Sequence, residues 1–309
     1  MDAKTLRFAL FGNVYQREKS DAIRLLLAAL RSHHAELCVD HEYYHFLDQL
    51  PDSPLEAFTA AGDGDEHPPL APQTFTDMPA CDFALSLGGD GTLLQTACRV
   101  RSRQTPIVGV NMGRMGFLAD AGTDDVEACV DALYSGDYCV EDRSLIQVEN
   151  HQGHIEGYDC ALNDVAILKQ DTASMISIRA TIDGEHLATY QADGLIVSTP
   201  TGSTAYSLSN GGPIITPRTG VLLMTAVAPH SLNIRPIVIP DSAVIELTVS
   251  SRSHTFLVAI DGRSQSLPEG TTLHLLRAPY TAKIVKRSGS NYFSTLRNKL
   301  MWAADSRLP

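Results

Sequence analysis

Short apolar runs alternate with amphipathic stretches along the first half of the chain. Residues 6–11, 83–87 and 107–110 are compact apolar runs of strand length. Ser20 precedes apolar residues at helical spacing, and residues 93–100 form a second stretch with a helical pattern. Strands that alternate with helices in this way predict a parallel sheet covered by helices.

The pattern changes after about residue 138, where apolar and polar residues alternate. Residues 175–182 alternate, Asp183 and Gly184 then predict a hairpin turn, and residues 186–191 form the returning strand. Further short strands are predicted at residues 196–199, 222–227, 244–249, 256–260 and 272–276. This half is therefore expected to be mainly antiparallel β, with residues 291–303 as a last helix.

Segment 51–79 interrupts the first half. It holds six of the sixteen prolines and the acidic run GDGDEH, which predicts a surface loop with one short helix near residues 55–60. The whole chain has 309 residues, of which 44% are hydrophobic and 19% charged. It is therefore long enough for two globular domains of ordinary composition.

Charge and cysteine content exclude several classes of protein. The chain carries 24 basic and 36 acidic residues, a net charge of −12, which argues against a nucleic-acid partner. Six cysteines without a CxxC pair predict reduced thiols, and neither a zinc site nor a disulfide scaffold. The apolar runs at the N-terminus and at residues 221–228 are too short for a signal sequence or a membrane span, so a cytoplasmic protein is expected.

The sequence GGDGT directly follows the predicted strand at residues 83–87. Gly88 and Gly89 allow a backbone to approach phosphate groups, and ligands of parallel sheets bind at the carboxyl ends of strands. Asp90, between glycines, is expected to be exposed at the tip, where its carboxylate could accept a proton or bind Mg²⁺. A tight strand–helix turn with a polar tip explains the same residues equally well. No GxxxxGKS or GxxxxGKT run is present, so a phosphotransferase with this turn is not a P-loop enzyme.

A second glycine-bearing loop follows the strand at residues 107–110. Asn111 and Gly113 lie at its start, and Arg114 could contact an anion if the two loops frame one cleft. Considered alone, this segment is more simply a loop. Few basic residues lie near the glycine turn, so a bound metal ion is expected to neutralise much of the charge of a triphosphate.

Two segments of the second half carry polar residues at the ends of strands. Asn163 and Asp164 provide donors and acceptors suited to ribose hydroxyls or a purine edge, although a turn before a strand explains them as well. In DGLIVSTPTGSTAYSLS, residues 193–209, a buried strand runs into a short helix with more hydroxyls than one cap needs. This surplus favours ligand contact. Asp193 opens the segment with no evident structural partner, and IDGR at residues 260–263 indicates a β-turn.

Together, the GGDGT and DGLIVSTPTGSTAY segments closely resemble those of the NAD kinase family, and PHSL at residues 229–232 and RPIVIP at residues 235–240 strengthen the resemblance. It implies transfer of the γ-phosphoryl group of ATP to the adenosine-ribose 2′-hydroxyl of NAD, which yields NADP, with Mg²⁺ or another divalent metal as the cofactor. It also implies a Rossmann-like α/β domain of residues 1–140, joined by residues 280–309. A C-terminal antiparallel β-rich, NAD-binding domain of residues 141–279 would follow, in a homodimer or homotetramer.

The resemblance also assigns roles to individual residues. Asp90 would accept the proton of the 2′-hydroxyl. Donor phosphates are assigned to Gly88, Gly89, Asn111, Gly113 and Arg114. NAD contacts are assigned to Gly91, Asn163, Asp164, Gln191, Asp193, Thr204, Ala205, Tyr206, Ser209, Ala228 and Arg263. Gln191 stands where some members carry arginine, which leaves the choice between ATP and polyphosphate as the donor open.

Three other classes compete with this interpretation. A lipid or diacylglycerol-type kinase shares the GGDGT turn, but it does not explain the TPTGSTAY segment, and no membrane-docking basic helix is present. A nicotinamide dehydrogenase is disfavoured because the chain has no GxGxxG run. A non-catalytic NAD-binding sensor is opposed only by Asp90.

Overall fold

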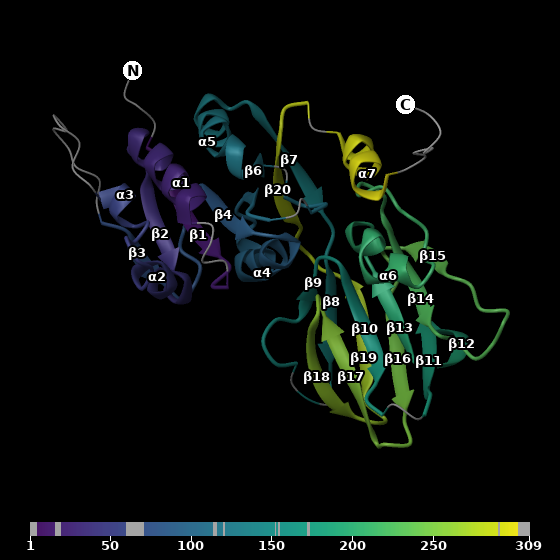
Figure 1. The fold of residues 1–309 in the computed structure, drawn as a ribbon. Coiled ribbons are helices and arrows are strands. Elements are labelled where there is room, and N and C mark those ends of the chain that lie inside the picture. Colours follow the sequence, from purple (N-terminus) through teal and green to yellow (C-terminus); the bar gives the residue numbers. More distant parts are fainter. Residues whose placement is uncertain are drawn as a thin grey trace. The chain divides into compact units, whose positions relative to one another are not determined.

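The computed structural model describes residues 5–15, 20–59, 71–113, 116–119, 121–151, 153, 155–171, 174–289 and 291–301 (Figure 1). Arg114 and residues 60–70 of the loop predicted at residues 51–79 lie outside the described residues. The chain divides into two compact units, one of residues 1–141 with 282–309 and one of residues 142–281. None of the helices in the described part is long and apolar enough to cross a membrane.

The first unit is built on a mostly parallel sheet, in the strand order β3-β2-β1-β4-β5-β20-β7, with β6 beside β5. Its strands are β1 (Arg7–Gly12), β2 (Glu36–Asp40), β3 (Gln73–Phe75), β4 (Phe83–Gly88), β5 (Ile107–Asn111), β6 (Ala121–Gly122), β7 (Tyr138–Arg143) and β20 (Ala282–Arg287). Its α-helices are α1 (Ser20–Ser32), α2 (His41–Asp48), α3 (Glu56–Thr59), α4 (Asp90–Val100), α5 (Val126–Ser135) and α7 (Tyr292–Leu300). The predicted parallel α/β architecture is confirmed, and the short helix expected near residues 55–60 is α3.

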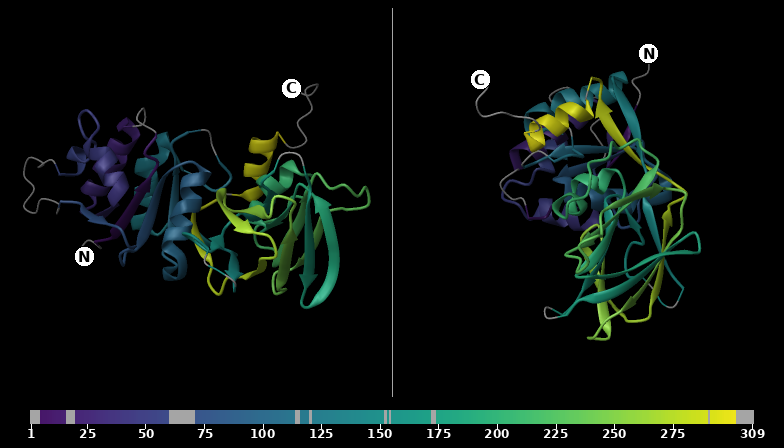
Figure 2. Two further views of the ribbon diagram at one scale, coloured as in Figure 1. Left: turned by 90° about the horizontal axis from the view of Figure 1, so that it is seen from below. Right: turned by 90° about the vertical axis from the view of Figure 1, so that its right-hand side faces the viewer.

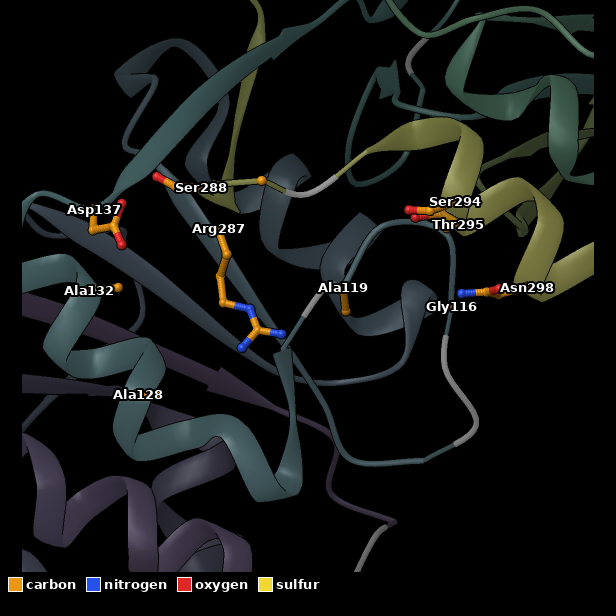
Figure 3. Close-up of a pocket in the computed structure, with 11 residues that line it drawn as sticks. Gly116, Ala119, Ala128, Ala132, Asp137, Arg287, Ser288, Ser294, Thr295 and Asn298 are labelled. Carbon is orange, nitrogen blue, oxygen red and sulfur yellow. The ribbon is translucent and has the colours of Figure 1, made fainter.

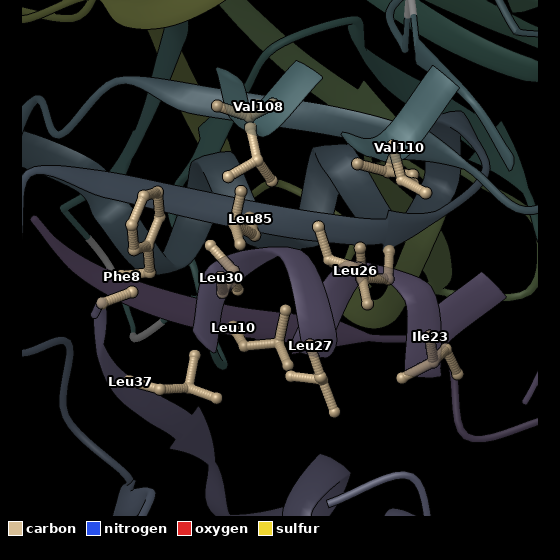
Figure 4. Close-up of a cluster of buried hydrophobic side chains, with 14 of the residues drawn as sticks. Phe8, Leu10, Ile23, Leu26, Leu27, Leu30, Leu37, Leu85, Val108 and Val110 are labelled. Carbon is tan, nitrogen blue, oxygen red and sulfur yellow. The ribbon is translucent and has the colours of Figure 1, made fainter. Parts of the chain in front are cut away.

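Helix α1 packs its apolar stripe onto one face of this sheet. Ile23, Leu26, Leu27 and Leu30 recur at helical spacing and are all buried against the strands (Figure 4). Burying each such side chain stabilises the fold by about 1.5–3 kcal/mol. On the strands, the side chains that meet this stripe include Phe8, Leu10, Leu37, Leu85, Val108 and Val110.

Helix α4 covers the opposite face. Val108 and Val110 of β5 point toward the α1 cluster, so Gly109 between them points to the other side. A Cβ on Gly109 would lie 2.7 Å from Leu93 Cδ1 of α4, which shows how closely this helix packs on β5. In the parallel register Gly88 lies beside Asn111, so the loops after β4 and β5 start at the same sheet edge.

The second unit consists of two antiparallel six-stranded sheets, in the orders β15-β14-β13-β10-β17-β18 and β12-β11-β16-β19-β8-β9 (Figure 2). Their strands are β8 (Ile146–Asn150), β9 (Cys160–Ala161), β10 (Asp164–Lys169), β11 (Ile176–Ile182), β12 (Glu185–Ala192), β13 (Gly194–Ser198), β14 (Val221–Val227), β15 (Ile237–Pro240), β16 (Ile245–Ser250), β17 (Thr255–Ile260), β18 (Arg263–Pro268) and β19 (Thr272–Arg277). Alternate residues of both sheets, such as Ile176 and Ile178 of β11 and Leu195 and Val197 of β13, share one apolar core. The predicted antiparallel β-rich half is confirmed.

Turn chemistry sets the register of the hairpin between β11 and β12. Asp183 and Gly184 have φ values of 50° and 83°, the left-handed pair that a two-residue hairpin turn requires. In the other sheet, β13 leads into a one-turn 3-10 helix (Thr201–Thr204) and the short helix α6 (Tyr206–Ser209). The polar segment predicted from residues 193–209 therefore starts on a central, fully buried strand.

Candidate functional site

The glycine turn connects β4 to α4 at the carboxyl edge of the first sheet. Helix α4 begins at Asp90, and its N-cap residue Gly89 offers no side-chain cap to the first N–H groups of the helix. Such N–H groups carry the positive end of the helix dipole and suit an anion. A Cβ on Gly88 would lie 2.1 Å from Thr92 Oγ1, so the turn needs glycine there. Apart from their chain neighbours and the helix's own backbone, no atom of the described residues lies within 4 Å of the Cβ positions of Gly89 and Gly91, which leaves space for a ligand.

The Asp90 carboxylate is held in one orientation by the loop after β5. Its Oδ2 accepts the Phe117 N–H at 2.7 Å and its Oδ1 accepts the Leu118 N–H at 3.1 Å. A Cβ on Gly116 would lie 1.9 Å from Asp90 Oδ1, so only glycine permits this approach. Lys286 Nζ donates to Leu118 O at 2.9 Å and fixes the loop from β20. The expectation of an exposed side chain with few contacts is wrong, because both carboxylate oxygens are bonded.

Asn111 shapes the start of the same loop. Its Oδ1 accepts the Gly113 N–H at 2.9 Å, as in an Asx turn. Its Nδ2 is buried and has no hydrogen-bond partner within the part of the chain that the structure describes. An unsatisfied buried amide group costs about 1–3 kcal/mol, so a ligand that accepts this N–H would be favoured. Arg114, the other candidate here, lies outside the described residues.

Asp261 organises the candidate residues of the second unit. Its carboxylate accepts three backbone N–H groups, from Leu162 at 2.8 Å, Asn163 at 2.8 Å and Asp164 at 3.1 Å. The residue has a φ of 47°, a left-handed conformation that aspartate tolerates better than most side chains do. The sequence indicated only a β-turn here, so this structural role was missed. Asp261 positions the pair Asn163 and Asp164.

The same pair is joined to the helix α6 segment. Asn163 O accepts the Thr199 N–H at 2.9 Å, and a Cβ on Gly202 would lie 2.0 Å from that carbonyl oxygen. The Asp164 carboxylate accepts the backbone N–H of Tyr206. Close backbone packing and this hydrogen bond therefore bring together two sequence segments that the motif analysis had identified separately.

Burial makes Asp164 an unusual carboxyl group. Loss of solvation and the nearby charge of Asp261 raise its pKa to about 7, and the hydrogen bond from Tyr206 opposes the shift. Burial also raises the pKa of Asp261, although its three N–H donors and the positive charge of Arg263 oppose this. Two buried carboxyl groups are thus held close together at a cost to stability, which is typical of a functional site.

Replacing Asp164 with asparagine is expected to stabilise the fold at alkaline pH. Because the folded-state pKa is raised, the stability contributed by the protonated carboxyl is fully present below about pH 4 and is lost as pH rises through about 7. Each unit of pKa shift is worth about 1.4 kcal/mol, so the advantage of Asp164→Asn should grow by about 2–4 kcal/mol between pH 4 and pH 8. Urea unfolding at both pH values measures it. If the free energies of unfolding of the two proteins change equally between the two pH values, the raised pKa of Asp164 is refuted.

Most hydroxyls of the segment at residues 198–209 are used within the protein. Ser203 Oγ donates to Pro200 O at 2.7 Å and accepts the Ile215 N–H at 2.9 Å. Internal hydrogen bonds also occupy the buried hydroxyls of Ser198, Thr199, Thr201 and Ser207. The argument that surplus hydroxyls favour a ligand is therefore wrong for these residues. The accessible side chains in the segment include Thr204, Ala205, Tyr206 and Ser209, which are the ones that the resemblance assigns to NAD.

Three further candidate residues lie around the start of β13. Asp193 Oδ1 pairs with Lys169 Nζ at 2.8 Å, so the expectation of an unpartnered carboxylate is wrong. Gln191 Nε2 donates to Ser177 Oγ at 2.9 Å on the neighbouring strand. Ala228 has a φ of 43°, a strained conformation for a non-glycine residue that is common at functional sites.

Arg263 supports the Asp261 turn from β18. Its Nε donates to Ile260 O at 3.3 Å and its Nη2 to Cys160 O at 3.5 Å. The guanidinium carbon lies 5.1 Å from the centre of the Tyr158 ring. These contacts hold the arginine at the wall of a cavity of about 310 Å³.

An uncapped helix N-terminus after a glycine turn, with a fixed carboxylate beside it, suits a nucleotide-dependent phosphotransferase, because the free N–H groups can bind phosphate and the carboxylate can accept a proton. A family model described as the ATP-NAD kinase N-terminal domain matches residues 12–138, and one described as the ATP-NAD kinase C-terminal domain matches residues 162–287. The chain belongs to the ATP-NAD kinase family and is a kinase. The resemblance inferred from its motifs is confirmed.

The similarity to known proteins covers nearly the full length of the chain. It is 49% identical over 303 residues to the NAD kinase of Bacteroides fragilis, covering 98% of this chain and 100% of that protein. It is 40% identical over 301 residues to the NAD kinase of Porphyromonas gingivalis, with coverage of 97% and 99%. Two crystal structures share the fold. Yeast NADH kinase complexed with NADH has a TM-score of 0.86 at 22% identity and covers 100% of this chain and 91% of that one. An Archaeoglobus fulgidus NAD kinase in complex with ATP has a TM-score of 0.68 at 24% identity, with coverage of 96% and 98%.

Proposed function

We propose that the chain transfers the γ-phosphoryl group of ATP to the adenosine-ribose 2′-hydroxyl of NAD, with Asp90 as the proton acceptor. The bond between the γ-phosphorus and the bridging oxygen of ATP breaks, and a bond to the 2′-oxygen forms. ADP leaves, and the proton of the hydroxyl passes to the Asp90 carboxylate. The observation that carries the proposal is this carboxylate, fixed by two backbone N–H groups beside the glycine turn of an ATP-NAD kinase chain.

The two units supply different contacts in this proposal. Residues 1–140 with residues 280–309 contribute Asp90, the donor-phosphate contacts and one NAD contact, Gly91, and residues 141–279 contribute the other NAD contacts. The phosphate contacts are Gly88, Gly89, Asn111, Gly113 and Arg114. The NAD contacts are Gly91, Asn163, Asp164, Gln191, Asp193, Thr204, Ala205, Tyr206, Ser209, Ala228 and Arg263. The hydrogen bonds that join Asn163 to Thr199 and Asp164 to Tyr206, the first residue of α6, support a single NAD-binding surface in the second unit.

Asp90 contributes orientation and proton acceptance. Two N–H donors fix the orientation of its carboxylate and leave lone pairs free for the 2′-hydroxyl. Phosphoryl transfer depends mainly on alignment and charge stabilisation, so the base acts late, when the attacking oxygen has become acidic. General-base help of this kind is worth about 10²–10⁴-fold in rate.

Mg²⁺ fits this site as an ion carried by the donor phosphates. No group of three or more His, Cys, Asp or Glu side chains that could hold a metal occurs among the described residues. Mg²⁺ in nucleotide sites is commonly bound by phosphates and only one or two carboxylates, and Asp90 provides one. When bound, the ion would neutralise part of the triphosphate charge.

Removal of divalent metal is therefore expected to abolish NADP formation. The protein offers no preformed metal cage within the described part of the chain, so chelation strips the ion from the nucleotide. The rate should be measured with excess EDTA and again after Mg²⁺ is restored. Undiminished turnover in EDTA would contradict this prediction.

The proposed activity is tested by incubating the pure protein with NAD, ATP and Mg²⁺. NADP is then assayed with an NADP-specific dehydrogenase, and parallel samples with NADH and with polyphosphate define the acceptor and donor range. NADP formation that needs both substrates supports the proposal. Binding of NAD without any turnover would instead favour the alternative of a non-catalytic NAD-binding sensor. A cytoplasmic location and a homodimer or homotetramer are further parts of the proposal, which the family resemblance supports.

A further inference from the structure

Lys299 on α7 has a buried ammonium group without a bonding partner. Its Nζ is shielded from solvent and forms no hydrogen bond to any residue that the structure describes. Lysine heads normally stay in water or pair with acceptors, because a buried charge without partners is costly. Other shielded lysines of the chain follow this rule, since Lys286 bonds to Leu118 O and Lys169 pairs with Asp193.

The position of α7 places this ammonium near the glycine turn. Thr295 and Asn298 line a pocket of about 500 Å³ together with Gly116, and they project from α7 toward the loop that carries Gly116 (Figure 3). Lys299 lies four residues after Thr295, on the same side of the helix. Gly116 in turn lies directly against the Asp90 carboxylate. Helix α7 belongs to the first unit, like α4 and the glycine turn.

The electrostatics of Lys299 agree with this placement. Burial lowers its pKa, and the negative charge of Asp90 counteracts that shift, so the two groups lie within interaction range. The two oxygens of Asp90 are already bonded to the N–H groups of Phe117 and Leu118. No described residue accepts a hydrogen bond from the Lys299 ammonium, so its N–H donors remain available to a ligand bound beside Asp90.

We propose that the Lys299 ammonium binds the γ-phosphate of the donor beside Asp90 and stays on the phosphoryl group during its transfer. This assignment rests on the proposed kinase function and adds a catalytic residue to it. A triphosphate supplies the multiple negative acceptors that the buried ammonium lacks. It also corrects the expectation of few basic residues near the glycine turn, because α7 brings a cation there from more than 200 residues along the chain.

Binding and kinetics of Lys299→Met test the proposal. Methionine keeps most of the length and the apolar character of the side chain but cannot donate, so one charge-assisted hydrogen bond is lost. Affinity for inorganic tripolyphosphate, measured by calorimetry, should fall by about 10–100-fold. In the kinase assay, kcat/KM for ATP should fall at least as much, with the KM for NAD unchanged. Lys299→Arg should recover part of both losses.

Arg297→Met is the matched control. It removes a positive charge from an exposed position of the same helix and should leave tripolyphosphate affinity and turnover within about twofold of wild type. The proposal is overturned if Lys299→Met binds tripolyphosphate like wild type, or if Arg297→Met loses as much. Tripolyphosphate binding requires neither NAD nor turnover. A wild-type protein that forms no NADP but shows the Lys299-specific loss would therefore refute the proposed function and leave the phosphate site standing.

Discussion

Asp90→Asn is expected to lower kcat by about 10²–10⁴-fold while NAD and ATP still bind. Asparagine retains the size of aspartate and can accept a hydrogen bond, but it cannot accept the proton of the 2′-hydroxyl. In this protein the substitution also changes a structural contact. One of the N–H groups of Phe117 and Leu118 would face an amide NH₂ and lose its acceptor, at a cost of about 1–3 kcal/mol. A lower Tm should therefore accompany the loss of turnover.

Kinetics of the folded variant separate the roles of Asp90. If the carboxylate acts as the base, kcat falls and added Mg²⁺ does not restore it. If the carboxylate mainly binds metal, raised Mg²⁺ recovers part of the rate. A folded Asp90→Asn enzyme with kcat within a few-fold of wild type would remove both assignments and make a binding-only sensor the better interpretation.

Gly116→Ala is expected to reduce kcat by about 10²-fold although the carboxylate is retained. The added methyl group would lie 1.9 Å from Asp90 Oδ1, so the carboxylate or the loop at residues 116–118 has to shift. Displacing a catalytic group by about 1 Å costs about 10²-fold in rate. Steady-state kinetics with purified protein measure the loss. Combined with Asp90→Asn, Gly116→Ala should add little, because both substitutions disrupt the same contact.

Gly122→Ala is the control for that experiment. A Cβ at Gly122 meets its nearest atom, Asp125 Oδ2, at 3.8 Å, which is an ordinary contact distance. This variant should retain wild-type turnover. If Gly116→Ala also retains it, the position of the Asp90 carboxylate is not critical and the proposed base is in error.

The architecture was predictable from hydrophobic patterning wherever that pattern was strong. The runs that became β1, β4 and β5 are predominantly apolar, and the alternation of β11 is confirmed by its burial in the shared core. Strands such as β20 and β7 lack such a signal. Lys286 is buried on β20 because its ammonium reaches Leu118 O, a compensation that no local pattern reveals.

The sequence motifs located the candidate site but did not reveal which hydrogen bonds hold its side chains in place. GGDGT and Asn163-Asp164 were recognised from sequence, whereas the partners of Asp90 and Asp164 come from distant segments. Short-range reasoning treated Asp90 as exposed, since two glycines flank it, and could not foresee that Gly116 allows another loop to approach. Lys299 gave no sequence signal, because a lysine in an amphipathic terminal helix is ordinarily solvated.

The central claim, Asp90-dependent transfer of phosphate to the 2′-hydroxyl, is tested most directly by a single-turnover reaction with γ-labelled ATP. Excess enzyme, Mg²⁺ and NAD are mixed with the labelled donor, and the products are separated by chromatography. The account predicts that wild type moves the label onto the 2′-position of NAD, while Asp90→Asn binds both nucleotides and leaves the label in ATP. Label that appears only as inorganic phosphate, or transfer by Asp90→Asn at the wild-type rate, would contradict it.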